Sequence, residues 1–130
     1  MAKNRIGLKK KAKSGEKDLL KILIDAILEK KGKDPVVIDL RKLEHAACDY
    51  FIICHGDSTT SVNAIAESIE EFAIHQAGAR PRSVEGKQVA HWIAIDFFTI
   101  VAHVFLKEQR MLYQLEDLWS DGKIKKIKEQ

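Results

Sequence analysis

A chain of 130 residues with a mass of 14.7 kDa is long enough for one hydrophobic core and too short for two. Hydrophobic residues make up 45% and charged residues 32%, which excludes a disordered chain, and a content of two Pro and seven Gly excludes collagen-like or low-complexity material. No apolar run reaches the roughly 18–20 residues that span a bilayer, and the basic N-terminus lacks a signal-peptide hydrophobic segment. We therefore expect a cytoplasmic protein with no membrane segment.

Positive charge is concentrated at the two ends of the chain. Residues 1–17 hold seven Lys and Arg against one Glu, and residues 123–130 hold four Lys against one Glu. The body between them, 18–122, holds 11 basic and 17 acidic residues, which favours a basic protein partner. The basic ends either seek a polyanion such as RNA or are solvated. We divide the chain into a flexible N-terminal extension over 1–17, a folded domain over 18–121 and a basic tail over 122–130.

The first half of the chain predicts one helix and two strands. Apolar residues recur at helical spacing over 18–31, and Gly32 ends this helix. The β-branched run 36–40 predicts a short strand, and 41–48 is polar and loop-like. Residues 50–54 are continuously apolar, which predicts a central strand buried on both faces.

The second half opens with the strongest helix signal. Apolar residues lie on one face of a helix between an N-cap at Ser58 and a terminating Gly78. Residues 80–86 read as a loop. Residues 90–97 and 99–106 then predict two adjacent antiparallel strands.

The register of this hairpin depends on its turn. A two-residue turn at 97–98 pairs Ile95 with Ile100 and sets Trp92 opposite His103. This turn lacks the Gly or Asn that tight hairpin turns favour.

The last predicted helix runs from about 107 to 119, with Met111, Leu112, Leu115 and Leu118 facing inward. The element order is therefore α-β-β-α-β-β-α. This order predicts an α/β or α+β fold with a mixed sheet of four or five strands flanked by helices.

Few residues form an arrangement typical of catalysis. Gly56-Asp57-Ser58 lies between a strand and a helix N-terminus, a place suited to an anion, although a turn with a Ser cap explains it as well. Asp39, Asp49 and Asp96 each stand alone in their strands, without the D-x-D pair that two-metal nucleotidyl transfer needs. We predict no catalytic residue and no enzyme.

A zinc site is the metal hypothesis that the sequence raises, because His45, Cys48, Cys54 and His55 lie close together. Cys54 and His55 point to opposite faces of a strand, and no further ligand pair completes a tetrahedral set. The thiols are better explained as small buried hydrophobes in a reducing compartment. We predict no metal and no cofactor.

Aromatic residues gather in the last third of the chain. Trp92 shares a strand face with Asp96, so this face cannot be wholly core. Aromatic side chains ringed by charge are typical of protein–protein hot spots, and core packing is the equal alternative. The five aromatics concerned are Trp92, Phe97, Phe98, Tyr113 and Trp119.

Several motifs together resemble the ribosomal silencing factor (Iojap-like) family over residues 18–121. They occur in the family's order and are Cys48-Asp49-Tyr50-Phe51-Ile52-Ile53-Cys54-His55-Gly56-Asp57-Ser58, Val84-Glu85-Gly86, Trp92-Ile93-Ala94-Ile95-Asp96-Phe97, Ile100-Val101-Ala102-His103-Val104-Phe105, Glu108-Gln109-Arg110 and Tyr113-Gln114-Leu115-Glu116-Asp117-Leu118-Trp119. The resemblance implies a fold related to nucleotidyltransferases but without their catalytic carboxylates. It also implies a non-enzymatic role.

In that role, the resemblance implies binding to the large ribosomal subunit through its fourteenth ribosomal protein, where the small subunit docks. The bound factor would block subunit joining and repress translation under nutrient limitation. The family's contact residues correspond here to Trp92, Asp96, Phe97, Phe98, Glu108 and Tyr113. A homodimer is compatible with the resemblance, and we expect the basic ends to touch nearby rRNA.

Two positions depart from the family pattern. Phe98-Thr99 replaces the usual Gly-Asp or Gly-Asn of the hairpin turn, which enlarges an exposed apolar tip, and Thr60 replaces a basic residue. Two other functions stay open. One is a phosphoryl or nucleotidyl transferase with its anion site at Gly56-Asp57-Ser58, and the other is an RNA-binding domain that acts through its basic ends.

Overall fold

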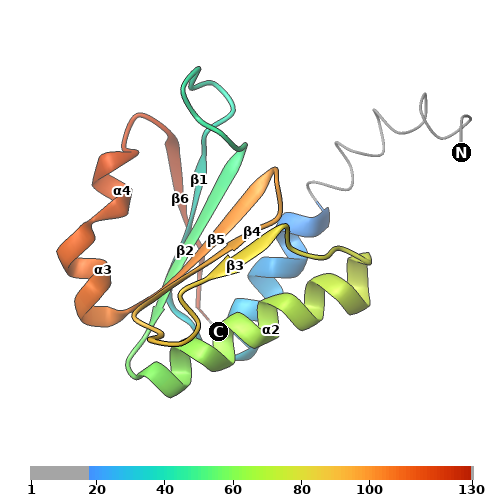
Figure 1. Cartoon of the computed structure of the whole chain (residues 1–130). Helices are drawn as coiled ribbons and strands as arrows, with labels where there is room; N and C mark the ends of the chain where they lie inside the picture. Colours follow the sequence, from blue (N-terminus) through green and yellow to red (C-terminus); the bar gives the residue numbers. More distant parts are fainter. Residues whose placement is uncertain (1–17, 130) are drawn as a thin grey trace, which may run out of the picture.

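The computed structural model describes residues 18–129, arranged around a six-stranded mixed sheet of order β3-β4-β5-β2-β1-β6 (Figure 1). The strands are β1 (Lys33–Asp39), β2 (Tyr50–Gly56), β3 (Ser83–Glu85), β4 (Trp92–Asp96), β5 (Ile100–Leu106) and β6 (Lys123–Lys126). The helices are one over residues 18–29, α2 (Thr59–Ala77), α3 (Lys107–Tyr113) and α4 (Leu115–Leu118). Only β2 and β5 pair in parallel, and the other neighbouring strands are antiparallel.

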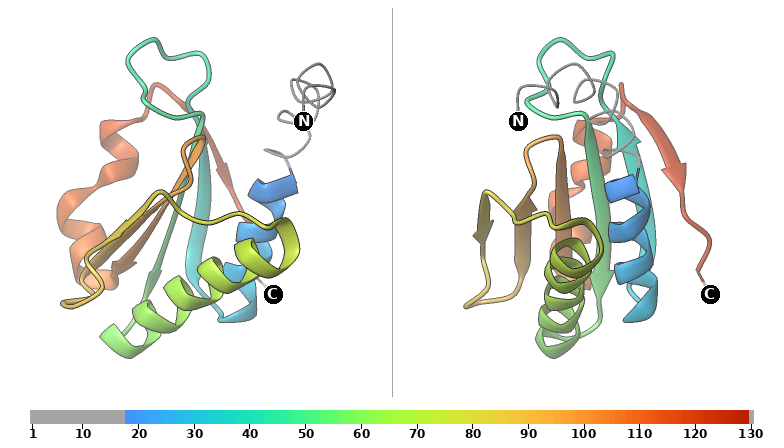
Figure 2. Two further views of the ribbon diagram at one scale, coloured as in Figure 1. Left: turned by 45° about the vertical axis from the view of Figure 1, so that its right-hand side comes forward. Right: turned by 90° about the vertical axis from the view of Figure 1, so that its right-hand side faces the viewer.

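Helices cover both faces of the sheet. The helix over 18–29 and α2 lie on one face, whereas α3 and α4 lie on the other (Figure 1). The first two run side by side across the sheet (Figure 2), where the Ser68 hydroxyl of α2 donates to the Ala26 carbonyl at 2.9 Å. None of the described helices is both long and apolar enough to cross a membrane.

The main core lies beneath α2 and the helix over 18–29. Ile52 and Cys54 of β2 point into it, and Ile53 points to the opposite face, where it joins a smaller core under α4. Burial on both faces explains the continuous apolar run of β2 and confirms its prediction as a central strand.

Both predicted caps of α2 are present. The Ser58 side chain accepts the Ser61 N–H at 3.1 Å, and Gly78 adopts φ 61° at the C-terminus. The helix therefore begins and ends where the sequence predicts.

The mixed α/β class is confirmed, with six strands in place of four or five. The additional strands are β3, in the segment predicted as a loop, and β6, in the lysine-rich C-terminal segment. Both are edge strands, held by backbone pairing to a single neighbour, so neither needs an apolar pattern of its own. The basic extension over 1–17 lies outside the described residues.

The predicted register of the β4–β5 hairpin is wrong by two residues. Ile95 pairs with Ala102, Trp92 pairs with Phe105, and the turn is at 98–99. Because side chains alternate with a period of two, the slip leaves each residue on its predicted face. Trp92 and His103 therefore remain on the same face as diagonal neighbours.

The predicted helix over 107–119 is broken into α3 and α4 at Gln114, which adopts φ 47°. Leu115 is buried as predicted, but Met111, Leu112 and Leu118 are exposed, which contradicts their predicted inward orientation. The break interrupts the helical period, so the two pieces do not share one apolar face.

Candidate functional site

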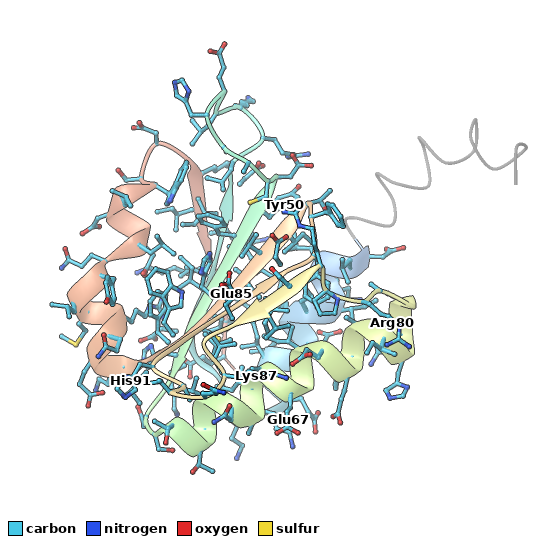
Figure 3. The ribbon with its side chains drawn as sticks, viewed as in Figure 1. Tyr50, Glu67, Arg80, Glu85, Lys87 and His91 are labelled. Atoms are coloured by element: carbon cyan, nitrogen blue, oxygen red, sulfur yellow. The ribbon has the colours of Figure 1, made fainter. Side chains whose placement is uncertain are left out.

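The second face of the sheet carries Trp92 at the start of β4, and a tight loop positions it. Gly86 adopts φ 92°, and a Cβ at this position would overlap the Trp92 carbonyl oxygen. The Ala90 N–H donates to the Gly86 carbonyl at 2.9 Å and closes the loop. Lys87, labelled in Figure 3, forms an ion pair with Glu70 of α2 at 2.8 Å. The Val84-Glu85-Gly86 motif therefore sets where the tryptophan enters the sheet.

Trp92 is partly exposed and is the centre of an aromatic cluster. Its indole stacks on Phe105 of β5 with ring centroids 4.8 Å apart, and Tyr113 of α3 lies 4.9 Å away. Phe51 meets Trp119 edge-on at 5.5 Å on the same face of the sheet. These contacts place α3 beside β4 and bring Trp92 and Tyr113 to one surface.

The indole N–H of Trp92 has a partner inside the protein. It donates to Nδ1 of His103 at 3.0 Å, and His103 is only 7% exposed. Burial lowers the pKa of His103 to about 4, so the imidazole is neutral near pH 7. Because Nδ1 accepts, the single ring proton is on Nε2.

The carboxylate of Asp96 is used at the hairpin tip. It forms an ion pair with Arg82 at 2.7 Å and accepts the Phe98 N–H at 2.8 Å. Burial alone would raise the pKa of Asp96, but the hydrogen bonds from Arg82 and Phe98 outweigh it and lower the pKa below the usual value. Asp96 therefore stabilises the turn and carries little uncompensated charge.

Phe98 occupies a strained position in this turn. It adopts φ 74°, and the Thr99 N–H donates to the Phe97 carbonyl at 3.0 Å, the pattern of a γ-turn centred on Phe98. A bulky residue is disfavoured there, and glycine would fit without strain. The ring is 60% exposed under the Arg82 guanidinium, 4.2 Å from its centroid. Phe97, by contrast, is buried in the main core.

Helices α3 and α4 expose several apolar side chains, of which Tyr113 contacts Trp92. Tyr113 is 53% exposed, and the side chains of Met111, Leu112 and Leu118 are exposed to a greater extent. Glu108 is exposed in the first turn of α3 and takes part in no ion pair within residues 18–129. The Trp92–Tyr113 pair, with the unpaired negative charge of Glu108 on the same helix as Tyr113, is suited to a basic protein partner.

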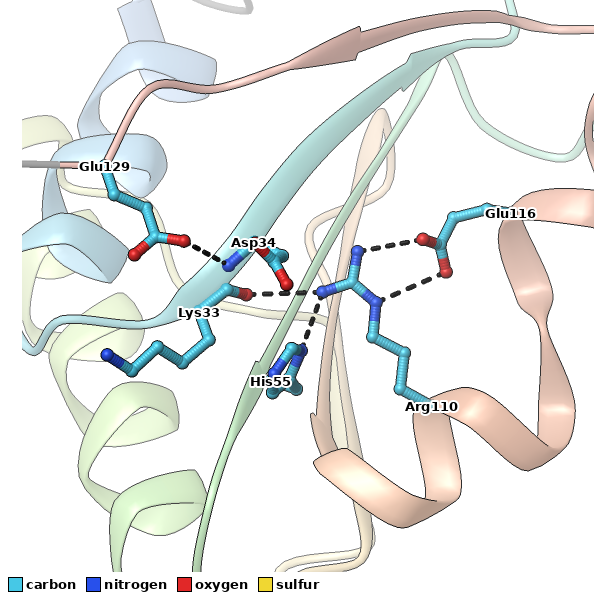
Figure 4. A network of polar contacts seen from close by, with 6 residues as sticks. All are labelled: Lys33, Asp34, His55, Arg110, Glu116 and Glu129. Carbon is cyan, nitrogen blue, oxygen red and sulfur yellow. Dashed lines mark hydrogen bonds and ion pairs between the residues drawn. The ribbon is translucent and has the colours of Figure 1, made fainter.

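Arg110, to which the sequence analysis gave no role beyond its place in a family motif, fastens these helices to the sheet (Figure 4). Its buried guanidinium pairs with Glu116 at 2.9 Å and donates to the Lys33 carbonyl at 3.2 Å. It also contacts Nδ1 of His55 at 3.0 Å. Burial and the neighbouring Arg110 charge lower the pKa of His55, so the imidazole accepts as a neutral ring.

A cleft of about 560 Å³ opens beside this network. It lies between the start of β1 and α3, and charges of both signs line it, including Asp34, Lys107, Asp117 and Lys126. No ion pair in the described part of the chain involves these four side chains. The mixed charge selects no single class of ligand.

The residues of the anion-site hypothesis serve the fold. Ser58 caps α2, and Gly56 lies so close to Ser61 that a Cβ would come within 2.6 Å of its hydroxyl. The residues of the zinc hypothesis are separated, since Cys54 lies in the main core and His55 on the opposite face with Arg110. Within residues 18–129, no group of three or more His, Cys, Asp or Glu is placed to hold a metal ion.

Comparison with known proteins gives the family. The family described as "Ribosomal silencing factor during starvation" matches residues 12–130. The chain belongs to the ribosomal silencing factor family.

Relatives of this chain are found in bacteria and in the mouse. The Bacillus subtilis ribosomal silencing factor is 38% identical over 107 residues, covering 82% of this chain and 89% of the relative. A mouse protein named "Mitochondrial assembly of ribosomal large subunit protein 1" is 31% identical over 108 residues, covering 82% of this chain and 47% of the relative.

Two solved structures confirm the fold of this family member. A Bacillus halodurans protein superposes with a TM-score of 0.71 at 36% identity, covering 79% of this chain and 94% of that one. A Chromobacterium violaceum protein gives a TM-score of 0.75 at 32% identity, covering 80% and 85%.

The structure places the predicted contact residues in two areas, one around α3 and one at the hairpin tip. Trp92 and Tyr113 touch each other, and Glu108 lies exposed on the same helix as Tyr113. Asp96 and Phe98 meet at the hairpin tip, with Phe97 in the core beneath. Sequence reasoning missed Arg82 and Arg110, because no local pattern marks a charged residue whose partner lies on another element.

Proposed function

We propose that this silencing factor binds the large ribosomal subunit through its fourteenth ribosomal protein. Bound there, it blocks joining of the small subunit and represses translation in the cytoplasm under nutrient limitation. The observation that carries the proposal is the partly exposed Trp92, held on β4 against Phe105 and in contact with the exposed Tyr113 of α3. A rigid aromatic anchor beside exposed apolar side chains is typical of a binding hot spot.

Charge supports a ribosomal protein as the partner. The body of the chain over 18–122 is acidic, and proteins embedded among rRNA phosphates are basic as a rule. The name of the mouse relative also refers to the large ribosomal subunit. A regulatory rather than catalytic role agrees with the structural use of Ser58 and Gly56 described above.

We assign the contact surface to Trp92, Asp96, Phe98, Glu108 and Tyr113, with Phe97 supporting the tip from the core. We also propose that the basic ends add contacts to rRNA and that self-association through the Phe98 tip gives a homodimer. Deletion of 123–130 is a poor test of the rRNA contact because it removes β6. Replacing Lys123 and Lys125 by Gln removes charge and keeps the strand.

The deciding experiment is sedimentation of the protein with separated ribosomal subunits. We expect the wild type to migrate with the large subunit and to reduce the joined-subunit peak when small subunits are added. Trp92→Ala should weaken binding about 30-fold, the effect of losing a central aromatic anchor. Ile124→Ala, which truncates an exposed apolar residue on β6, is the matched control and should bind normally.

Two outcomes would overturn the proposal. The first is no binding to the large subunit even at low salt, and the second is equal binding by folded Trp92→Ala and by the wild type. In either case, a nucleotide screen with wild-type protein and Ser58→Ala would test the transferase alternative.

A further inference from the structure

The hydrogen bond between Trp92 and His103 crosses two strands of the partner-binding face. His103 pairs with Ala94 in the β4–β5 register, so Trp92 is its diagonal neighbour. The indole Nε1–H donates to Nδ1 of the imidazole at 3.0 Å, and the ring centroids lie 5.8 Å apart. The pair is therefore fixed by the sheet and does not depend on a mobile loop.

His103 occupies this position at an energetic cost. Its Nε2 is buried and has no hydrogen-bond partner within the described residues. Phe51 and Phe105 pack against the imidazole, with centroids 4.7 and 6.3 Å away. In such an apolar setting a leucine would fill similar space without leaving a buried hydrogen-bond donor unpaired. The feature that histidine supplies here and leucine lacks is the acceptor Nδ1, which takes the indole N–H of Trp92.

We propose that His103 is a positioning residue for partner binding: it takes the indole N–H of Trp92 and fixes the ring so that its hydrocarbon surface meets the partner. The inference rests on the ribosomal function proposed above. Stacking on Phe105 and contact with Tyr113 restrict the ring on its other sides.

This arrangement restricts the chemistry of the partner group that meets Trp92. The indole has one donor, and His103 already uses it. The partner group is therefore an aliphatic side chain or the cationic end of Lys or Arg stacked on the ring, and not a hydrogen-bond acceptor. A basic ribosomal protein supplies such groups.

The first test needs no partner. The chain has two Trp, so ¹⁵N-labelled protein gives two indole N–H resonances, with Trp119 as the internal reference. His103→Leu should shift the Trp92 resonance upfield and speed its exchange with solvent. His103→Asn, whose side-chain oxygen can replace Nδ1 as acceptor, should restore both values in part. An unchanged Trp92 resonance in His103→Leu would overturn the proposal.

The second test is a double-mutant cycle on binding to the large subunit. Trp92→Phe keeps a ring and removes the N–H, so it should lose about the same three- to tenfold in affinity as His103→Leu and less than Trp92→Ala. His103→Leu should weaken binding about three- to tenfold in the wild-type background, the worth of one hydrogen bond. In the Trp92→Phe background the same substitution should change affinity less than about twofold, because its effect passes through the indole N–H.

The outcomes separate this inference from the proposed function. Normal wild-type binding with equal effects of His103→Leu in both backgrounds would overturn the role of His103 alone. A loss in Trp92→Phe as large as that in Trp92→Ala would overturn the inferred partner chemistry. Failure of the wild type to bind the large subunit overturns the proposed function and this inference with it.

Discussion

Arg110 and Glu116 form an ion pair across the break between α3 and α4, with Nη2 and Oε2 2.9 Å apart. The arginine side chain is 9% exposed and that of the glutamate 28%, so the positive charge is the more deeply buried member. The same guanidinium holds the β1 backbone through Lys33 and the end of β2 through His55. One side chain therefore ties both short helices to the centre of the sheet.

Removing the charge of Glu116 should destabilise the fold. Glu116→Gln leaves a buried guanidinium without its counter-charge, so we expect the free energy of unfolding to fall by about 2 kcal/mol. Glu108→Gln is the matched control on the exposed surface of α3 and should change the free energy of unfolding by less than about 0.5 kcal/mol. Urea denaturation of the two variants measures the difference, and equal values would contradict a structural role for the Arg110 pair.

Stability should fall as the pH drops from about 6.5 to 4. Burial lowers the pKa of His103 to about 4, whereas in the unfolded chain it is near 6.5. The unfolded state therefore binds a proton before the folded state does, and His103 alone contributes a loss of up to about 3 kcal/mol across this window. The depressed pKa of His55 acts in the same direction.

The lowered pKa values of the carboxylates do not explain a loss in that window. The pKa values of Asp39 and Asp96 are also lowered, but their contribution to stability is lost only below the usual carboxylate pKa of 3.8. Denaturation of wild type and His103→Leu at pH 7, 5.5 and 4.5 is the measurement. We expect a shallower pH dependence in the variant, and parallel curves would contradict the assignment to His103.

Phe98→Gly should raise the free energy of unfolding by about 1 kcal/mol, because glycine adopts φ 74° without strain. The gain is reduced by loss of the stack with Arg82, which is small at an exposed site. Phe98→Ala is the control, since it removes the ring and keeps a Cβ in the left-handed conformation. Chemical denaturation should give Phe98→Gly a higher free energy of unfolding than Phe98→Ala. The reverse order would show that the turn is not strained.

Glu108→Lys should slow association with the large subunit, and the effect should grow as salt is lowered. Glu67→Lys makes the same change in net charge on exposed α2, on the opposite face of the sheet, and should have little effect. Asp96→Lys is a less informative reversal, because Asp96 also holds Arg82 and the Phe98 N–H. Equal association rates for the Glu108 and Glu67 variants in stopped-flow measurements would exclude local steering by α3.

The long elements could be predicted from apolar spacing, because each buries a face of its own. That pattern located α2 with both of its caps, and it identified β2 as the central strand. It could not find β3 or β6, whose side chains are mostly exposed and whose strand geometry comes from pairing with a neighbour. The same pattern predicted one continuous helix across Gln114, where the left-handed conformation of this residue separates α3 from α4.

The candidate site was predictable to the extent that it follows strand alternation. Alternation alone set Trp92 and His103 on one face, and a register wrong by two residues did not change this. The pairing of Arg82 with Asp96 and of Arg110 with Glu116 and His55 had no such signal. These contacts depend on how separate elements meet in space, which spacing within one element does not encode.

The pairing of β6 with β1 constrains how the chain folds during its own synthesis. Of the described strands, β6 is translated last, yet it hydrogen-bonds the strand that is translated first. Until residues 123–126 leave the exit tunnel, the outer edge of β1 is an unpaired strand that can add to another chain. A nascent molecule is therefore open to misassembly while it is still attached to a ribosome, and the four-residue lysine-rich strand closes that edge only after it has emerged.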